Sequence, residues 1–180
     1  MYCDALTVAA VADELRCKLL GGRIQDVLLV DHLVLGLEVY AHRQRHYLLL
    51  SARPEEGGRV HLVRGRLRRG VATPAPFLLR LRKYASAGHV INIQQPPLER
   101  LLQLTIQGAE GVVVLVAEIM GRYSNIILLE EDGTILECVK HVPASQNRYR
   151  VLLPSYPYVL PPAQKKLDAT ALTPAHLAKV

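Results

Sequence analysis

Short apolar runs of strand length, each followed by a turn signal, recur along almost the whole chain. Their length and their content of branched aliphatic residues favour β-strands over helices. Asp31-His32 predicts a tight turn, and Asp132-Gly133 predicts a hairpin. The predicted strands span residues 24–30, 33–39, 46–51, 59–63, 89–94, 101–107, 112–120, 124–130 and 134–142.

Two segments show helical spacing instead. The first follows Asp4, a residue type suited to capping a helix N-terminus, and is ended by Gly21-Gly22. The second covers residues 77–87, after a proline-rich opening, and is ended by Gly88. Strand runs that bracket two helices predict an α+β fold with a β-sandwich-like core and flanking helices.

The chain changes character after Leu153. Prolines alternate with tyrosines there, which predicts an extended and ordered connector. Thr173-Pro174 then resembles an N-cap followed by a first-turn proline, so a further helix is predicted to begin close to Val180. We therefore expect one domain over residues 1–160, with 161–180 as a linker and the truncated start of a helical region of a longer protein.

Several classes of protein are disfavoured by what the sequence lacks. Half of the 180 residues are hydrophobic, enough to build a core without disulfides or metals. No uninterrupted apolar run approaches the ~18 residues of a membrane-spanning helix, and no signal peptide opens the chain, so a cytoplasmic location is expected. Cys3, Cys17 and Cys138 form no CxxC pair and are expected to be buried or half-buried free thiols. The histidines follow neither HxxxH nor HExxH spacing, so no metal, no cofactor and no catalytic centre are expected.

Positive charge is concentrated in one stretch of the sequence. The formal net charge is +6, and acidic residues are absent between Glu56 and Glu99. A helix over 77–87 would expose Arg80 and Lys83 while burying Leu81 and its apolar neighbours. Residues 64–70 are loop-like, and both this loop and the exposed helix face carry positive charge. Together they predict a surface that binds along a phosphate backbone, of RNA or of DNA. The alternative is a solvated loop whose charges pair with acids from elsewhere in the fold. The basic residues of the stretch are Arg59, Arg64, Arg66, Arg68, Arg69, Arg80, Arg82 and Lys83.

Three other polar groups are candidates for nucleic-acid contacts. Arg122 and Asn125 lie between two apolar runs and have donors for phosphate or a base edge, although Asn125 could equally cap a turn. Residues 147–150, Asn-Arg-Tyr-Arg, suit stacking on a nucleotide, and the alternative is a turn with its tyrosine packed on the core. Glu99-Arg100 precedes a predicted strand, and by chemistry alone a surface ion pair is favoured for it.

Nine blocks of the sequence, which together extend over nearly the whole chain, follow the order of one known family. The blocks are residues 1–7, 21–24, 47–51, 76–83, 118–127, 132–133, 140–143, 147–150 and 153–154. They resemble the NFACT N-terminal domain, a family found in bacterial ribosome-associated quality-control factors. An older name for such proteins is fibronectin- or fibrinogen-binding protein A.

The resemblance implies a function that the residues alone do not define. Family members bind large ribosomal subunits that carry a stalled nascent chain, and recruit alanyl-tRNA for template-free tailing. The chemistry belongs to the ribosome, so the domain is expected to bind RNA without being an enzyme. The resemblance also implies a fold similar to the N-terminal domain of formamidopyrimidine-type DNA glycosylases, followed by a helix-hairpin-helix region.

The predicted RNA-binding residues combine the resemblance with the polar groups above. In the family an Asp-Arg pair associated with tRNA recruitment occupies the position of Glu99-Arg100, so here a glutamate replaces the aspartate. Tyr123 likewise stands where the family has histidine. A fibronectin-binding surface adhesin is the alternative, and base excision is disfavoured because the chain begins Met-Tyr instead of with the glycosylases' N-terminal proline. The predicted set is Glu99, Arg100, Arg80, Arg82, Lys83, Arg122, Asn125, Asn147, Arg148 and Arg150.

Overall fold

The computed structural model describes residues 3–71 and 75–162 of the chain. That part contains the helices α1 (Ala5–Leu19) and α2 (Pro76–Ala85) and the 3₁₀ helix η1 (Gly121–Tyr123). Its strands are β1 (Arg23–Asp31), β2 (Val34–Ala41), β3 (Gln44–Ser51), β4 (Arg59–Val63), β5 (His89–Gln94), β6 (Leu101–Gly108), β7 (Gly111–Glu118), β8 (Asn125–Glu130) and β9 (Ile135–Cys138).

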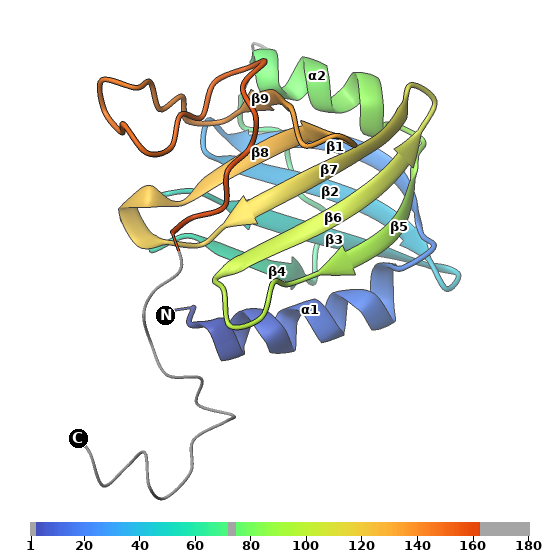
Figure 1. Cartoon of the computed structure of the whole chain (residues 1–180). Helices are drawn as coiled ribbons and strands as arrows, with labels where there is room; N and C mark the ends of the chain where they lie inside the picture. The colour runs from blue at the N-terminus through green and yellow to red at the C-terminus, as the bar shows by residue number, and fades with distance from the viewer. Residues whose placement is uncertain (1–2, 72–74, 163–180) are drawn as a thin grey trace, which may run out of the picture.

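The strands form one antiparallel sheet that folds into two facing layers (Figure 1). The strand order is β4-β3-β2-β1-β5-β6-β7-β8-β9, so every pairing except β1–β5 joins strands that are consecutive in the sequence. The β1–β5 pairing consists of one residue pair, Arg23 with His89. One layer therefore contains β1–β4 and the other β5–β9, and the predicted α+β class is confirmed.

The two helices lie on opposite sides of the sheet, where they close the space between its layers (Figure 1). α1 contacts β2 and β4 of one layer and β5 and β6 of the other. α2 contacts β1 on one side and β6, β7 and β9 on the other. Both helices are amphipathic, as predicted, and their apolar faces enter the main core. The buried residues are Val8, Ala12, Leu15 and Leu19 of α1, and Phe77, Leu78, Leu81 and Ala85 of α2.

Strand β8 is buried on both faces, which explains why its sequence does not alternate between apolar and polar residues. Ile126 and Leu128 point into the main core between the layers. Ile127 and Leu129 belong to a second apolar cluster on the outer face of the layer. Leu152 and Tyr158 pack into this second cluster, so the chain after β9 covers part of the outer face of the layer.

The predicted starts and stops of the elements agree with the structure in most places. The Asp4 carboxylate accepts a hydrogen bond from the Thr7 backbone N–H at 2.7 Å, as an N-cap should. Gly21 adopts φ +75° just beyond α1, a conformation that favours glycine. The hairpin turn at Asp132-Gly133 is confirmed, because the Gly133 N–H donates to the Glu130 carbonyl at 3.0 Å.

Two sequence predictions are wrong in detail. The last strand, predicted over 134–142, ends at Cys138, because the Asn125 side chain binds the backbone of Lys140 in place of a strand partner. Cys17 is exposed on α1, whereas Cys3 and Cys138 are buried as expected. The helix predicted from Thr173 lies outside the described residues. Neither described helix is long and apolar enough to cross a membrane.

Candidate nucleic-acid interface

A groove of about 560 Å³ lies between η1 and the chain after β9. Arg122, Asn125, Asn147 and Arg150 line it, so it brings together four residues of the predicted RNA-binding set. They come from two segments that the sheet holds side by side. One is the β7–β8 connection, and the other is residues 139–162, called the connector from here on.

The Glu99-Arg100 loop lies at the same end of the molecule. The Ile119 N–H, next to η1, donates to the Arg100 carbonyl at 2.8 Å. Leu101, the first residue of β6, pairs with Glu118, the last residue of β7. Both side chains of the loop are partly exposed, and the ion pairs of the described residues do not include one between Glu99 and Arg100.

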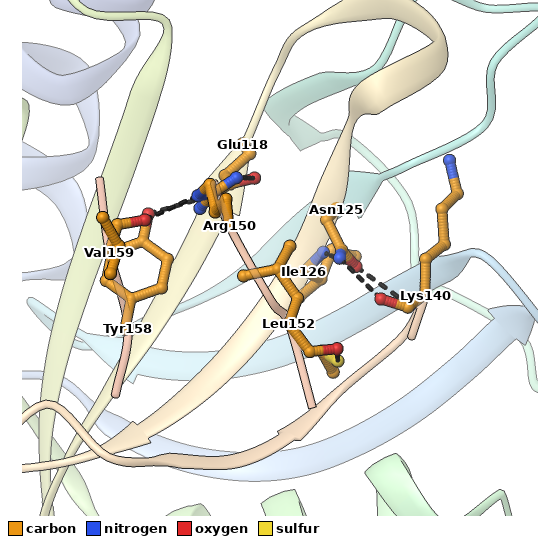
Figure 2. Close-up of polar contacts among 9 residues, drawn as sticks. Glu118, Asn125, Ile126, Lys140, Arg150, Leu152, Tyr158 and Val159 are labelled. Atoms are coloured by element: carbon orange, nitrogen blue, oxygen red, sulfur yellow. Dashed lines mark hydrogen bonds and ion pairs between the residues drawn. The ribbon is translucent and has the colours of Figure 1, made fainter. Parts of the chain in front are cut away.

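Arg150 is buried, and other groups of the chain bind its guanidinium (Figure 2). Nη1 donates to Glu118 Oε2 at 2.9 Å, and Nη2 donates to the other oxygen of the same carboxylate. Nε donates to the Val159 carbonyl at 2.5 Å. The Glu118 side chain is fully buried, so this fork-to-fork pair joins the end of β7 to the connector.

Tyr158 adds a third buried side chain to the Glu118–Arg150 pair. The Tyr158 hydroxyl donates to Glu118 Oε1 at 2.7 Å, and the Arg150 guanidinium lies 5.2 Å from the centre of the ring. Burial, reinforced by the negative charge of Glu118, raises the pKa of the Tyr158 hydroxyl far above its usual range. Burial works against the charge of Arg150, but the hydrogen bonds and charge of Glu118 outweigh it and raise the pKa of the guanidinium. The Arg150 guanidinium therefore keeps its charge, and the Tyr158 hydroxyl its proton, at neutral pH.

The side-chain amide of Asn125 also makes its hydrogen bonds within the chain (Figure 2). Its Nδ2 donates to the Lys140 carbonyl at 2.8 Å, and its Oδ1 accepts from the N–H groups of Ile126 and Lys140 at 2.9 and 3.0 Å. The structure thus shows the capping role that the sequence left open for this residue. Asn125 shapes one wall of the groove, and its amide hydrogen bonds are made within the chain.

The cationic side chains at the rim of the groove are arranged differently. Arg122 is exposed and lies 4.7 Å from the centre of the exposed Tyr123 ring, with Nη2 donating to its hydroxyl at 2.5 Å. Asn147 accepts from the N–H groups of Tyr149 and Arg150, so residues 147–150 form a turn, as the alternative interpretation predicted. Tyr149 is 94% exposed, so the alternative in which this tyrosine packs on the core is wrong. Arg148 is exposed in the same turn.

The predicted residues of α2 lie elsewhere. Lys83 is 3.4 Å from Glu110, which lies in the β6–β7 turn at the far end of β6 from Arg100. Eight residues of β6 separate the two places, a distance of roughly 25 Å at about 3.3 Å per strand residue. Arg80 is exposed on α2, as predicted. The structure therefore divides the ten predicted residues between the groove end and the α2 surface.

Arg82 differs from its neighbours on α2 because its guanidinium is bound within the chain. Nε and Nη2 donate to the Val27 carbonyl of β1 at 2.9 and 2.8 Å, which holds α2 against the sheet. We expect Arg82→Met to lower the free energy of unfolding by about 1–2 kcal/mol, because a charge-assisted contact is lost. Arg80→Met, an exposed position on the same helix, should change it by less than about 0.5 kcal/mol in the same urea titration. Equal effects of the two substitutions would show that the Arg82 contact contributes nothing.

The acid-free stretch of the sequence is only partly neutralised in the fold. Arg59 pairs with Glu56 at 2.9 Å, and Arg66 lies 3.8 Å from Glu38. Together with Lys83, three of its eight basic residues have acidic partners in the described part of the chain. Arg64, Arg68 and Arg69 are exposed. The predicted alternative, charge pairing with acids from elsewhere, therefore holds for some of the stretch and not for the rest.

One polar cluster was not predicted from the sequence. Glu137, Cys138 and His141 have side-chain ligand atoms within 4.8 Å of one another at the end of β9. The signal was present as Glu-Cys-x-x-His at 137–141, a spacing outside the HxxxH and HExxH patterns. Burial raises the pKa of the Cys138 thiol to about 12, so the thiol is protonated at neutral pH when no metal is bound.

The fold and the groove define a small α+β domain, an antiparallel sheet closed by two helices, with a groove at one end that arginine and asparagine side chains help to line. The family model of the NFACT N-terminal and middle domains matches residues 4–180, so the chain belongs to the NFACT family. The family resemblance drawn from the sequence blocks is confirmed.

Relatives and solved structures agree with this assignment. The chain is 36% identical over 174 residues to the Rqc2 homolog RqcH of Streptococcus pneumoniae, covering 93% of this chain and 31% of the relative. It is 35% identical to the Bacillus subtilis protein of the same name, covering 93% of this chain and 30% of the relative. The crystal structure of the N-terminal domain of fibronectin-binding protein PavA from Streptococcus pneumoniae superposes with a TM-score of 0.87 at 35% identity. The superposition covers 98% of this chain and 67% of that one. The chain thus spans about a third of the length of the RqcH relatives.

Proposed function

We propose that this chain is the RNA-binding N-terminal domain of a ribosome quality-control factor. On this proposal the intact protein binds stalled large ribosomal subunits in the cytoplasm and recruits alanyl-tRNA, and this domain provides RNA contacts without catalysing a reaction. The observation that carries the proposal is the family match over residues 4–180, with relatives named RqcH. Residues 1–160 would form the domain, and 161–180 would begin a helical region.

The groove end is the better of the two predicted RNA surfaces. Arg100, Arg122 and Arg148 are at least partly exposed there, and the ion pairs of the described residues leave all three without an acidic partner. Arg presents a planar fork that suits phosphate oxygens. The exposed rings of Tyr123 and Tyr149 beside these arginines suit stacking on unpaired bases.

This proposal assigns a structural role, and not RNA contact, to Arg150, Asn125 and Arg82. Their donors are already bound within the chain, so they hold the groove and α2 in place. Glu99 keeps the carboxylate of the family position on a stem one methylene longer, beside Arg100. The α2 surface, with Arg80 and Lys83, is proposed as a second contact about 25 Å away along β6, a separation that one folded RNA can span.

Binding of tRNA to the full-length protein tests the proposal. We expect Arg100→Gln and Arg122→Gln each to weaken binding about tenfold at low salt, or about 1.4 kcal/mol. Each should also lower the slope of log affinity against log salt concentration by about 1, because one phosphate contact is lost. Fluorescence anisotropy with labelled tRNA over a series of salt concentrations measures both quantities.

Arg43→Gln is the matched control for these substitutions. It removes the same charge from an exposed arginine in the β2–β3 turn, at the other end of β3 from Ser51 and the groove. Affinity and salt slope should stay within twofold of wild type. Binding that does not depend on salt, or equal losses in all three variants, would contradict the proposal.

Fibronectin binding is the second candidate, because solved structures similar to this chain carry that name. The two candidates differ in the ligand that Arg122 would contact. If fibronectin bound the full-length protein and Arg122→Gln left tRNA binding unchanged, the second candidate would be favoured. A likeness to formamidopyrimidine-type glycosylases remains a prediction about the fold.

A further inference from the structure

Three metal-ligand side chains of different chemistry meet at the end of β9. The ligand atoms of Glu137, Cys138 and His141 lie within 4.8 Å of one another. Ligand atoms around a tetrahedral zinc ion are about 3.5 Å apart, given bonds of about 2.0–2.3 Å. Shifts of about 1 Å would therefore bring the three atoms into coordination distance of one ion.

A cavity of about 270 Å³ adjoins this cluster and gives an ion access. His32, in the β1–β2 turn, lines the same cavity, as does the start of α2 at Pro76. One side of the cluster therefore faces the cavity, which provides room for a water ligand and is also lined by the His32 imidazole. A site with three protein ligands and one open position is a common arrangement for zinc.

Charge also favours a divalent ion here. The Glu137 side chain is 10% exposed, and its Oε1 lies 2.7 Å from Nε2 of the half-exposed His141 imidazole. The Cys138 thiol is buried, with the Leu152 carbonyl as its acceptor at 3.4 Å. A divalent ion bound by one carboxylate and one thiolate forms a neutral centre, which a buried position tolerates better than an isolated carboxylate.

We propose that Glu137, Cys138 and His141 bind a single zinc-class divalent ion, with the fourth position open toward His32. A thiolate, an imidazole and a carboxylate suit zinc or cobalt(II) and not magnesium or calcium. On binding, the Cys138 sulfur gives its proton to solvent and forms the bond to the metal, so one proton is released at this ligand. The proposal does not rest on the RNA contacts proposed above, and His141 lines both this cavity and the groove.

Titration of the full chain with Co²⁺, followed by displacement with Zn²⁺, tests the site. One equivalent of Co²⁺ should produce the near-ultraviolet absorption of a cobalt–thiolate bond, and Zn²⁺ should remove it. Cys138→Ser should abolish the absorption, and Cys17→Ser, at the exposed cysteine of α1, should leave it unchanged. His141→Ala should weaken affinity at least about tenfold, since loss of even an indirect partner of a metal ligand costs about 10–100-fold.

Thermal unfolding keeps the test decisive if Cys138→Ser is unstable. His141 is half exposed, so His141→Ala is expected to fold. Zn²⁺ should raise the melting temperature of the wild type and raise it less in His141→Ala, because only the folded state holds the three ligands together. Absence of the cobalt–thiolate absorption, its loss in Cys17→Ser, or equal affinity in His141→Ala would each overturn the proposal.

Discussion

Replacement of Arg150 with alanine is expected to lower the free energy of unfolding by about 3–5 kcal/mol, the cost of leaving a buried charge without its partner. Glu118 would lose its charged partner, and of the two side chains that donate to its carboxylate only the Tyr158 hydroxyl would remain. The lost contact to the Val159 carbonyl would also release the connector from the sheet. Urea unfolding followed by circular dichroism measures the change.

Three further single variants and one double mutant separate charge pairing from packing at this position. Arg148→Ala, two residues away and exposed, should change stability by less than about 0.5 kcal/mol. In a double-mutant cycle, Glu118→Gln should recover part of the loss caused by Arg150→Met, since the unpaired charge is removed. Additive effects of Glu118→Gln and Arg150→Met would contradict the pairing.

Asn125→Ala is expected to cost about 2–4 kcal/mol, the second largest loss. The substitution leaves the buried Ile126 N–H and the part-buried N–H and carbonyl of Lys140 without their partners, and each unsatisfied buried group costs about 1–3 kcal/mol before water enters. It would also free residues 140–142, which form one side of the groove. The same unfolding measurement applies.

Asn147→Ala provides the matched control. Asn147 also accepts hydrogen bonds from two backbone N–H groups, but it is exposed, so water can replace the amide. Its loss should stay below about 1 kcal/mol. Comparable losses in the two variants would mean that burial of Asn125 has no energetic role.

The sequence predicts the strands well because their signal is local. The boundaries of β4 (Arg59–Val63) and β5 (His89–Gln94) agree with prediction, since a branched apolar run and a turn residue suffice to define them. The end of β9 was missed because it depends on Asn125, fifteen positions back from Lys140. A capping contact of that range leaves no periodic trace in the sequence.

The roles of individual polar residues were harder to predict for a related reason. Arginine and asparagine are equally suited to phosphate oxygens and to internal carbonyls, so residue type does not separate binding from scaffolding. Arg150 meets Glu118 across 32 positions, and Arg82 meets Val27 across 55. Only the fold brings these partners together. Arg100 and Arg122 remain predictions for RNA contact, now placed at one end of the molecule.

The single residue pair between β1 and β5 has a consequence for how the chain folds. Every other strand pairing is between sequence neighbours, so each layer is a meander whose hairpins close short loops. Hairpins of this kind form in about 1–10 µs, whereas bringing together segments that are distant in the sequence carries a larger entropic cost. The rate-limiting event should therefore be the docking of two largely preformed meanders where residues 21–24 meet residues 87–90, with α1 and α2 packing across the join.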